Sequence, residues 1–278
     1  MKTLTFNEIC DAVCELTEAC SRITPSCGAA MKAAYEKESN SNAKFALEML
    51  AKNAEVASRN RLPVCQDTGM AVVFVKLGQD VRIEGGLLDD AINEGIRLGY
   101  SKNGYRASVL DPITRVNTRD NTPAVIHVSL AVGDKLQISF LPKGFGSENM
   151  SALYMLTPSA GIEGVKKSVI DAVRAAGSNP CPPVVIGVGI GGTAEKAMLT
   201  AKEQLLREVG KPSDDETLAG LEKELLDGIN ALGIGAQGFG GNTTALAVHI
   251  GKYPTHISAL PVAVNVQCNA VRMSSVTL

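Results

Sequence analysis

The stretch RLPVCQDTGMAVVFVKLG, residues 61–78, joins a group of reactive side chains to a strand-like run. A cysteine, an amide, a carboxylate and a hydroxyl occupy the successive positions 65–68, and a glycine follows them. From Met70 onward the side chains are mostly apolar and β-branched, which is typical of a buried β-strand. A loop at a strand end can hold reactive groups on a rigid scaffold and still leave them reachable, so residues 65–68 form a candidate site.

Helical and strand-like patterns extend outward from this stretch in both directions. Apolar residues recur at helical spacing from Phe6 to Cys20 and from Asn42 to about Ser58. Further helices are predicted at 86–100, 161–177, 193–210 and about 214–232, and further strands at 124–132, 135–141, 182–192, 241–251 and 257–268. Gly133 and Asp134 predict a tight hairpin between two of these strands. Thr193 is a candidate helix N-cap.

This order of elements predicts a mixed α/β (α+β) fold, with a helical N-terminal region followed by a mixed sheet flanked by helices. The sequence contains no internal repeat, low-complexity segment or obvious linker. A chain of 278 residues is long enough to bury a substantial core. We therefore expect a single domain over residues 1–278.

Composition excludes several classes of partner. The chain is 45% hydrophobic and 20% charged, as in ordinary globular proteins, and its net charge of -2 provides no field to attract nucleic acid or anionic lipid. No apolar run reaches the roughly 18 residues of a membrane span. The first 20 residues are amphipathic and acidic, unlike a signal peptide. We expect a cytoplasmic protein.

The seven cysteines are too sparse for a disulfide scaffold, and their number is odd. They fall into an N-terminal group, Cys10, Cys14, Cys20 and Cys27, and three isolated residues, Cys65, Cys181 and Cys268. Members of the first group lie in an apolar helical stripe, which favours core packing over a metal-binding pair. The isolated three lie at the edges of strand-like runs, but their separations form no local metal motif, so spacing alone leaves ligation open.

The glycine-rich stretch GVGIGG, residues 187–192, follows a predicted strand and precedes a predicted helix. That position is typical of dinucleotide-binding loops. The order G-x-G-x-G-G nevertheless differs from the G-x-G-x-x-G fingerprint, and no acidic residue ends a second strand about 20 residues further on. We do not expect nucleotide binding.

Six blocks of sequence resemble a known family, in collinear order from about Val64 to Arg272. They are PVCQDTGMAVVFVKLGQ, NTPAVIHVSL, KGFGSENMSAL, NPCPPVVIGVGIGGTAEKA, GIGAQGFGGNTTALAVHI and YPTHISALPVAVNVQCNAVR. They resemble the α subunit of class I fumarate hydratase, in the iron–sulfur hydro-lyase family that also contains L(+)-tartrate dehydratase. The resemblance implies that Cys65, Cys181 and Cys268 bind a [4Fe-4S] cluster. Three ligands for four irons leave one iron open to act as a Lewis acid on the substrate.

The same resemblance implies a set of substrate-contacting residues. They are Gln66, Asp67, Arg106, the backbone around Gly146, and His256. Dehydration of malate needs groups that move protons and donors that stabilise charge on a carboxylate, and Asp67 is expected to transfer a proton or polarise the hydroxyl.

Without the resemblance, several of these residues have simpler interpretations. Arg106 would then be interpreted as a solvated surface charge, and His256 would be interpreted as a histidine in a turn. His127 and His249 lie inside strand-like runs and are expected to be core or satisfied polar residues. Lys143, beside the GFGSEN block, is expected to be a solvated lysine.

Two positions depart from the family pattern: Phe145 replaces a frequent glycine and Ala236 a frequent proline. Single-chain members continue into a smaller C-terminal domain that supplies further catalytic groups. We therefore expect a separate β subunit to complete the active site.

The expected function is reversible hydration of fumarate to (S)-malate by the α subunit of a [4Fe-4S] hydro-lyase, with a small dicarboxylate as substrate. The alternative is an L(+)-tartrate dehydratase α subunit, and KGFGSENMSAL resembles the fumarase version of its block more closely. A third hypothesis, a non-catalytic iron–sulfur sensor, does not explain Asp67 and Arg106.

Overall fold

The computed structural model describes residues 2–278, which group into two compact units. The first unit contains the chain up to Ile23 together with residues 54–145 and 272–278, and the second contains residues 24–53 and 146–271. Each unit therefore combines segments that are distant in sequence. The expectation of one iron–sulfur hydro-lyase domain over the whole chain stays a prediction.

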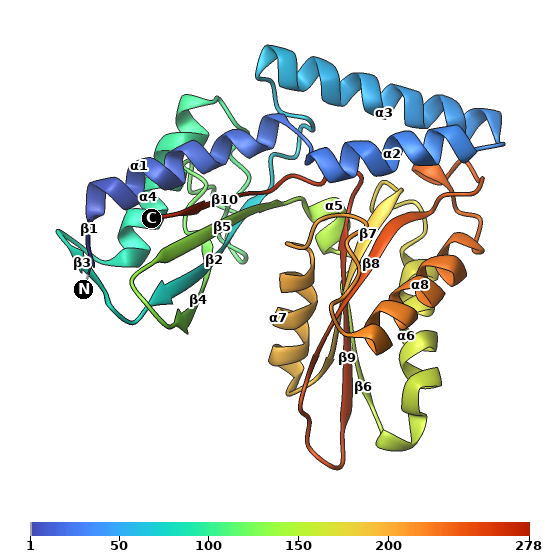
Figure 1. Cartoon of the computed structure of the whole chain (residues 1–278). Coiled ribbons are helices and arrows are strands. Elements are labelled where there is room, and N and C mark those ends of the chain that lie inside the picture. Colours follow the sequence, from blue (N-terminus) through green and yellow to red (C-terminus); the bar gives the residue numbers. More distant parts are fainter. Residues whose placement is uncertain (1) are drawn as a thin grey trace. The chain divides into compact units, whose positions relative to one another are not determined.

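The first unit is built on a four-stranded sheet in the order β10-β5-β2-β4 (Figure 1). Its strands are β2 (Met70–Gly78), β4 (Val125–Ala131), β5 (Leu136–Lys143) and β10 (Ser274–Thr277). β2 pairs in parallel with β4 and antiparallel with β5, and β10 pairs antiparallel with β5. A second, two-stranded sheet joins β1 (Lys2–Thr5) and β3 (Val81–Glu84).

The predicted hairpin between residues 124–132 and 135–141 is wrong, because β2 lies between β4 and β5. The connection instead covers the end of β2: Gly78 N donates to Lys135 O at 2.9 Å and Asp80 N to Gly133 O at 3.0 Å. Six of the nine residues of β2 are buried, so its backbone groups need partners along both edges. Two flanking strands meet that need, whereas a β4–β5 hairpin would leave one edge of β2 open.

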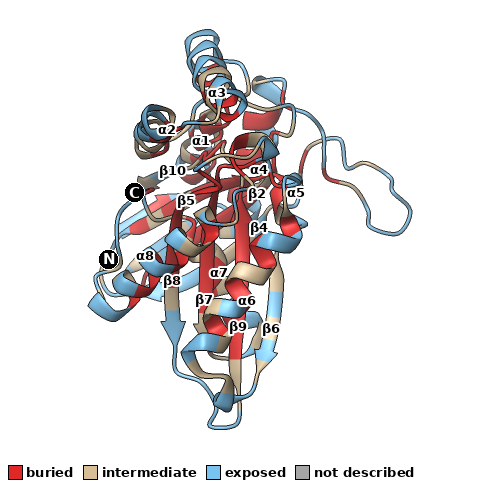
Figure 2. Cartoon of the chain, turned by 90° about the vertical axis from the view of Figure 1, so that its right-hand side faces the viewer, coloured by how far each residue is buried: buried red, intermediate tan, exposed pale blue. Residues whose placement is uncertain are grey.

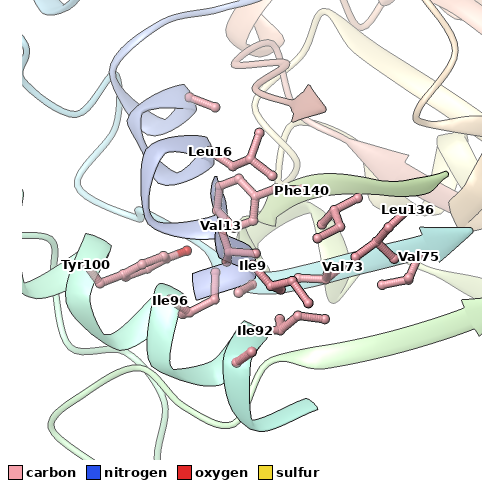
Figure 3. Packing of buried hydrophobic residues seen from close by; sticks show 14 of the residues in the cluster. Ile9, Val13, Leu16, Val73, Val75, Ile92, Ile96, Tyr100, Leu136 and Phe140 are labelled. Carbon is pink, nitrogen blue, oxygen red and sulfur yellow. The ribbon is translucent and has the colours of Figure 1, made fainter. Parts of the chain in front are cut away.

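Two helices cover this sheet and form the core of the first unit. α1 (Phe6–Leu16) begins with a capping box between Thr5 and Glu8, and α4 (Leu88–Lys102) packs against it. Apolar side chains from both helices meet those of β2 and β5 (Figure 3). The helices approach closely because Gly95 faces α1 and Gly99 faces the turn that follows it. An added Cβ would lie 2.6 Å from Cys10 O at Gly95 and 2.4 Å from Thr17 Oγ1 at Gly99.

The predicted N-terminal helices are confirmed, with one addition. α1 is followed by a 3₁₀ turn over Thr17–Ser21, and the second predicted helix is α3 (Ser41–Asn60). Between them lies α2 (Pro25–Lys37), whose N-cap Thr24 accepts from Cys27 N. The sequence did not reveal α2 because its many alanine residues give little contrast between an apolar and a polar face.

The second unit contains a four-stranded sheet in the order β6-β9-β7-β8. The strands are β6 (Ala152–Leu156), β7 (Val184–Gly191), β8 (Ala245–Tyr253) and β9 (Leu260–Gln267); the helices packed on them are α6 (Gly161–Ala176), α7 (Ala194–Gln204) and α8 (Glu216–Asn230). β7 pairs in parallel with β8 and antiparallel with β9. α6 and α8 bury apolar side chains against one face and α7 covers the other, so the central strands are buried (Figure 2).

The predicted fold class is confirmed, with strands and helices mixed along the chain. The predicted helix over 193–210 ends earlier, at Gln204, and the Thr193 hydroxyl bonds Glu195 Oε1 at 2.6 Å without capping a backbone N–H. Among residues 2–278 there is no helix with both the length and the apolar character to cross a bilayer.

The glycines of GVGIGG serve the packing of α7 on the sheet. A Cβ added to Gly187 would lie 2.0 Å from Ala201 O, and one added to Gly189 would lie 2.0 Å from Ala197 O. Real Cβ atoms do not approach a carbonyl oxygen so closely, so these positions need glycine. Helix packing, and not phosphate binding, explains this pair of glycines.

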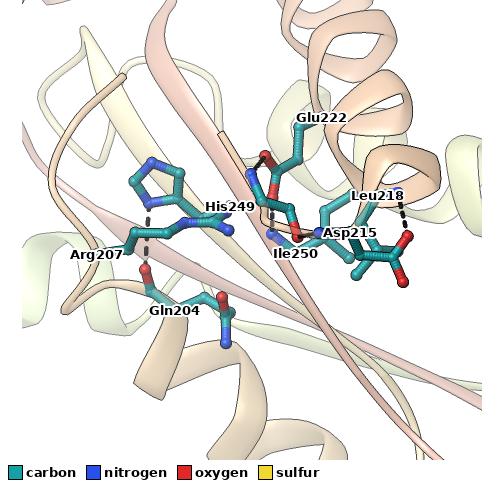
Figure 4. Close-up of polar contacts among 8 residues, drawn as sticks. Gln204, Arg207, Asp215, Leu218, Glu222, His249 and Ile250 are labelled. Atoms are coloured by element: carbon teal, nitrogen blue, oxygen red, sulfur yellow. Dashed lines mark hydrogen bonds and ion pairs between the residues drawn. The ribbon is translucent and has the colours of Figure 1, made fainter. Parts of the chain in front are cut away.

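A buried polar cluster covers the free edge of β8 (Figure 4). The Glu222 carboxylate accepts from Ile250 N at 2.7 Å and from Ser213 N at 2.9 Å, and it forms an ion pair with Arg207. His249 Nδ1 lies 3.2 Å from Gln204 O. His249 is 1% exposed, which confirms the expectation that it is a core histidine.

Gly189→Ala is predicted to lower the free energy of unfolding by about 1–3 kcal/mol, because the new methyl group overlaps α7. The matched control is Gly220→Ala on the exposed face of α8, where an added Cβ meets no atom within 4 Å. That change should raise stability by up to about 1 kcal/mol through helix propensity. Urea unfolding midpoints test both, and equal stability of the two variants would contradict the packing explanation.

His249 is predicted to make stability depend on pH. Burial, and then the Arg207 cation, lower the pKa of His249 from 6.5 to about 4. Between these values the unfolded chain binds a proton that the native chain does not, so the free energy of unfolding falls as pH drops from above 6.5 to about 4. The loss is roughly 3 kcal/mol at about 1.4 kcal/mol per pKa unit. Urea titrations from pH 4 to 8 should show that the free energy of unfolding of His249→Gln lacks this pH-dependent loss. If the variant and the unchanged protein had the same pH profile, the assignment to His249 would be wrong.

Candidate active site

Three buried side chains of the first unit donate hydrogen bonds to the backbone of the loop before β2. Three successive carbonyl groups, at residues 67–69, each accept one hydrogen bond. Arg272 Nη1 donates to the first at 2.9 Å, Cys20 Sγ to the second at 3.4 Å and Tyr100 Oη to the third at 3.0 Å. The backbone of this loop is therefore fixed by donors from three separate parts of the chain.

The carboxylate of Asp67 is oriented by two backbone N–H groups. Oδ1 accepts from Gly69 N at 3.0 Å and Oδ2 accepts from Phe145 N at 2.8 Å. An ionised carboxylate has about four acceptor positions, so two bonds leave room for a further donor. Asp67 is half-buried. The structure thus presents it as an oriented acceptor at the edge of the unit.

Gly69 allows this loop to lie on the end of β5. Its φ is +84°, and an added Cβ would lie 2.6 Å from Pro142 C. Both the left-handed backbone and the close contact require glycine. The sequence QDTG therefore has a geometric reason to end in glycine.

Three other predicted site residues accompany Asp67 in the first unit. Cys65 is half-buried, and its Sγ donates to Gln66 Oε1 at 3.4 Å. Gln66 and Arg106 are exposed, and the carbonyl of Arg106 accepts from Thr68 Oγ1 at 3.5 Å. The first unit therefore brings a thiol, an amide and a carboxylate to one loop, and the backbone of Arg106 lies beside that loop.

The prediction that Lys143 is a solvated lysine is wrong. Its side chain is 1% exposed, and Nζ donates to Gly144 O at 3.3 Å. The reason is that β5 ends inside the unit, where residues 140–144 are all buried. Lys143 pairs with Met70 in the sheet, so a buried lysine side chain lies beside the start of β2.

The second unit brings together Cys181 and Cys268. Cys181 precedes β7 and Cys268 follows β9, and the antiparallel register pairs Val185 with Gln267. Asn269 donates to Cys181 O through both its backbone N, at 3.3 Å, and Nδ2, at 2.8 Å. Two of the three isolated cysteines thus share one end of the sheet.

The backbone at Cys181 is in a conformation that non-glycine residues rarely adopt. Its φ is +54°. The next carbonyl, that of Pro182, accepts from Gln237 N and Gln237 Nε2, both at 2.8 Å. Such local strain costs on the order of 1 kcal/mol or more and persists where surrounding bonds enforce it, most often at functional sites.

Core packing is confirmed for three of the four N-terminal cysteines; Cys10, Cys20 and Cys27 are buried, and Cys14 is half-buried. Two of them also support the loops of the candidate site. Cys20 bonds the loop containing Asp67, and Cys27 Sγ donates to Asn269 O at 3.3 Å, next to Cys268. Burial raises the pKa of both thiols to about 12, so each remains a protonated donor.

Gly146 and His256 occupy different ends of the second unit. Gly146 lies in the short helix α5 (Phe145–Glu148), and a Cβ added to it would lie 3.7 Å from Asn179 O, close to Cys181 in sequence. His256 is exposed in the connection before β9, with Nδ1 2.7 Å from Ser258 Oγ. β9 has eight residues, Leu260–Gln267, and at about 3.3 Å per residue its length separates His256 from Cys268 by roughly 25 Å. This unit does not bring His256 to the cysteine pair.

The three isolated cysteines are the candidate ligands for a metal centre. Thiolate donors suit iron–sulfur clusters and zinc. Cys65 lies in the loop of the first unit, and the other two lie at one end of the second. Across residues 2–278 no three His, Cys, Asp or Glu side chains form a ready-made metal site.

Sequence inspection missed the residues that hold these loops. Arg272, Asn269 and Gln237 lie within the recognised sequence blocks, and their position next to predicted ligands was a usable signal. Cys20 and Tyr100 carried no such signal, because each lies in an ordinary apolar helical pattern.

Comparisons with known proteins agree on one family. The family model described as Fumarate hydratase (Fumerase) matches residues 10–277. The chain is 42% identical over 272 residues to the "Putative L(+)-tartrate dehydratase subunit alpha" of Methanocaldococcus jannaschii, covering 95% of each chain. It is 32% identical over 246 residues to the L(+)-tartrate dehydratase subunit alpha of Escherichia coli strain K12, covering 87% of this chain and 81% of the relative.

The burial of the cysteines predicts their order of alkylation in the metal-free chain. At pH 8 a thiol of pKa about 12 is ionised to only about one part in 10⁴, so Cys20 and Cys27 should react with iodoacetamide at least about 100-fold more slowly than exposed Cys181. Peptide mass spectrometry over time measures this, and urea should abolish the difference. Early labelling of Cys20 or Cys27 in the native chain would contradict the structure.

Proposed function

Because this chain belongs to the fumarate hydratase family, in which its relatives are L(+)-tartrate dehydratase α subunits, we propose that it is the α subunit of a [4Fe-4S] hydro-lyase acting on a 2-hydroxydicarboxylate. The observation that carries the proposal is the loop of the first unit. It combines Cys65, a candidate cluster ligand, with an oriented Asp67 carboxylate two residues later. A thiol used only for structure would not need these neighbours.

Cys65, Cys181 and Cys268 would hold the cluster, which when bound supplies a Lewis acid for the hydroxyl group of the substrate. The chemistry of the donor set fits, because thiolates are the ligands of such clusters. The strained backbone of Cys181 supports this assignment, since strain enforced by Asn269 and Gln237 is typical of functional sites.

The side chains of the first unit have separate roles in this proposal. Asp67 holds or moves a proton at the reacting hydroxyl, because its carboxylate is fixed and still has acceptor capacity. Exposed Arg106 pairs with a substrate carboxylate, and the Gln66 amide donates a further hydrogen bond. The backbone around Gly146 is proposed as another contact, whereas His256 is assigned to the substrate by the family resemblance alone.

The preferred substrate pair is fumarate and (S)-malate. The family description and the block KGFGSENMSAL support it. L(+)-tartrate, converted to oxaloacetate, is the second candidate, and the names of the relatives support it. The two substrates differ by one hydroxyl group, so the same residues can serve either.

We further propose that a β subunit completes the enzyme. The relatives are named as α subunits, which supports a heteromeric assembly. We expect the β subunit to contribute the base that removes the C3 proton, because no residue of this chain has been assigned to that step.

Anaerobic purification tests the proposal. The chain should carry about four irons and four sulfides, and Cys65→Ser, Cys181→Ser or Cys268→Ser should each abolish binding. Cys10→Ser is the matched control, since Cys10 is buried in the helical stripe of α1 and should leave iron content unchanged. A colourless, iron-free anaerobic protein would refute the cluster.

The substrate is then decided with the assembled α/β enzyme. Fumarate, (S)-malate and L(+)-tartrate are supplied separately, and kcat/KM is measured for each. Higher kcat/KM for fumarate supports the first candidate and higher kcat/KM for L(+)-tartrate supports the second. No turnover of any of the three by the iron-loaded assembly would refute the hydro-lyase.

A further inference from the structure

We propose that Arg272, Cys20 and Tyr100 form a carbonyl clamp that positions Asp67 for catalysis. The clamp consists of the three hydrogen bonds from these side chains to the carbonyl groups of residues 67–69. The catalytic part of this inference rests on the proposed function of Asp67. The structural part, that the clamp orders the loop, does not.

The three donors are held rigidly because they are buried and come from separate elements. Arg272 precedes β10, Cys20 lies in the 3₁₀ turn after α1, and Tyr100 lies in α4. Their exposed fractions are 1%, 0% and 1%. Cys20 and Tyr100 also belong to the apolar core of the first unit, where Figure 3 shows Tyr100 beside Ile96. A close-packed core leaves such donors little freedom to move.

The direction of each hydrogen bond is fixed by chemistry. Burial raises the pKa of Cys20 to about 12 and the pKa of Tyr100 well above its usual value, so both groups stay protonated. The guanidinium of Arg272 is a donor at every accessible pH. All three side chains therefore act as donors, and the carbonyl groups cannot turn away without losing a bond inside the core.

Fixing these carbonyl groups also fixes the carboxylate of Asp67. Each carbonyl shares a rigid peptide plane with the N–H of the next residue. The plane that contains the carbonyl of residue 68 also contains Gly69 N, which donates to Asp67 Oδ1 at 3.0 Å. The guanidinium also lies near the second support: a Cβ placed on Gly144, the residue before Phe145, would lie 3.2 Å from Asp67 Oδ2 and 3.7 Å from Arg272 Nη2.

The energetics of Arg272 argue against a purely structural role. It is among the largest fully buried side chains of the described chain, and its Nε has no hydrogen-bond partner there. Burying a cation with an unmet donor costs free energy, and an apolar residue of similar volume is often as stable or more so. A positioning role gives a reason for a guanidinium at this place.

Amide hydrogen exchange tests the ordering directly in the isolated chain and needs no activity. Tyr100→Phe removes only the Oη donor and Arg272→Lys removes the planar donor while keeping the charge. Both should speed exchange at Gly69 and Phe145 by roughly 10-fold or more, with amides of β2 unchanged, as expected for local opening. Tyr105→Phe is the matched control: Tyr105 packs edge-on against Tyr100, and its Oη bonds Thr17 O at 3.2 Å, outside the loop.

The kinetic test uses the α/β enzyme with matched iron content. Asp67→Asn should lower kcat by roughly 10² to 10⁴-fold, as for loss of a general acid or base. Arg272→Lys should lower kcat by roughly 10-fold with KM little changed, because it acts through Asp67. In an Asp67→Asn background, Arg272→Lys should cause no further loss, since two changes on one path are not additive.

The outcomes separate the two parts of the inference. Faster exchange confined to the loop, together with a non-additive kcat loss, supports the clamp and its catalytic role. Loop-confined exchange with an unchanged kcat in Arg272→Lys keeps the clamp but removes its catalytic role, whereas an unchanged kcat in Asp67→Asn removes Asp67 from the proposed mechanism. Unchanged exchange at Gly69 and Phe145, or equal acceleration in β2, overturns the clamp. Additive losses of kcat overturn its action through Asp67.

Discussion

The hydrogen bonds along both edges of β2 are the constraint on which the first unit depends. β2 is buried, so its backbone groups must be paired on each side, and β4 and β5 supply those partners. The pairing with β5 sets Met70 opposite Lys143. That register carries the following residues to the loop before β2, where Phe145 N bonds the Asp67 carboxylate. The candidate active site therefore follows from strand pairing.

The register between β7 and β9 plays the same part in the second unit. Antiparallel pairing of these strands places the residue before one strand near the residue after the other, which joins Cys181 and Cys268. Gly187 and Gly189 allow α7 to lie directly on β7, and this packing buries the strand. The same register sends His256 to the opposite end of the sheet. The eight residues of β9 thus separate His256, which the family resemblance assigned to the substrate, from the two cysteines that it assigned to the cluster.

Several buried polar groups lie beside the loops of the candidate site. Lys143 and Arg272 are each 1% exposed, and both lie beside residues 67–70. Two buried cysteines donate to the backbone of these loops: Cys20 bonds Thr68 O, next to Asp67, and Cys27 bonds Asn269 O, next to Cys268. Because burying polar groups costs free energy unless they are bonded, their position is informative. They give these loops defined shapes where apolar packing alone would leave the carbonyl groups unpaired.

Most helices and the longer strands could be predicted from the sequence alone, whereas α2 and the short strands β1, β3, β6 and β10 could not. Helical spacing in α1 and α4 and the apolar run of β2 are local patterns, and the residues near each position were enough to predict them. The family blocks likewise predicted Cys65, Asp67 and Arg106 as site residues. The three-dimensional arrangement was needed to show that β4 and β5 flank β2 and that Lys143 is buried. It was also needed to show that Arg272, Cys20 and Tyr100 bond one loop. The physical reason is that strand pairing and burial depend on residues distant in sequence, and a local pattern contains no information about which distant backbone or side chain will supply a partner.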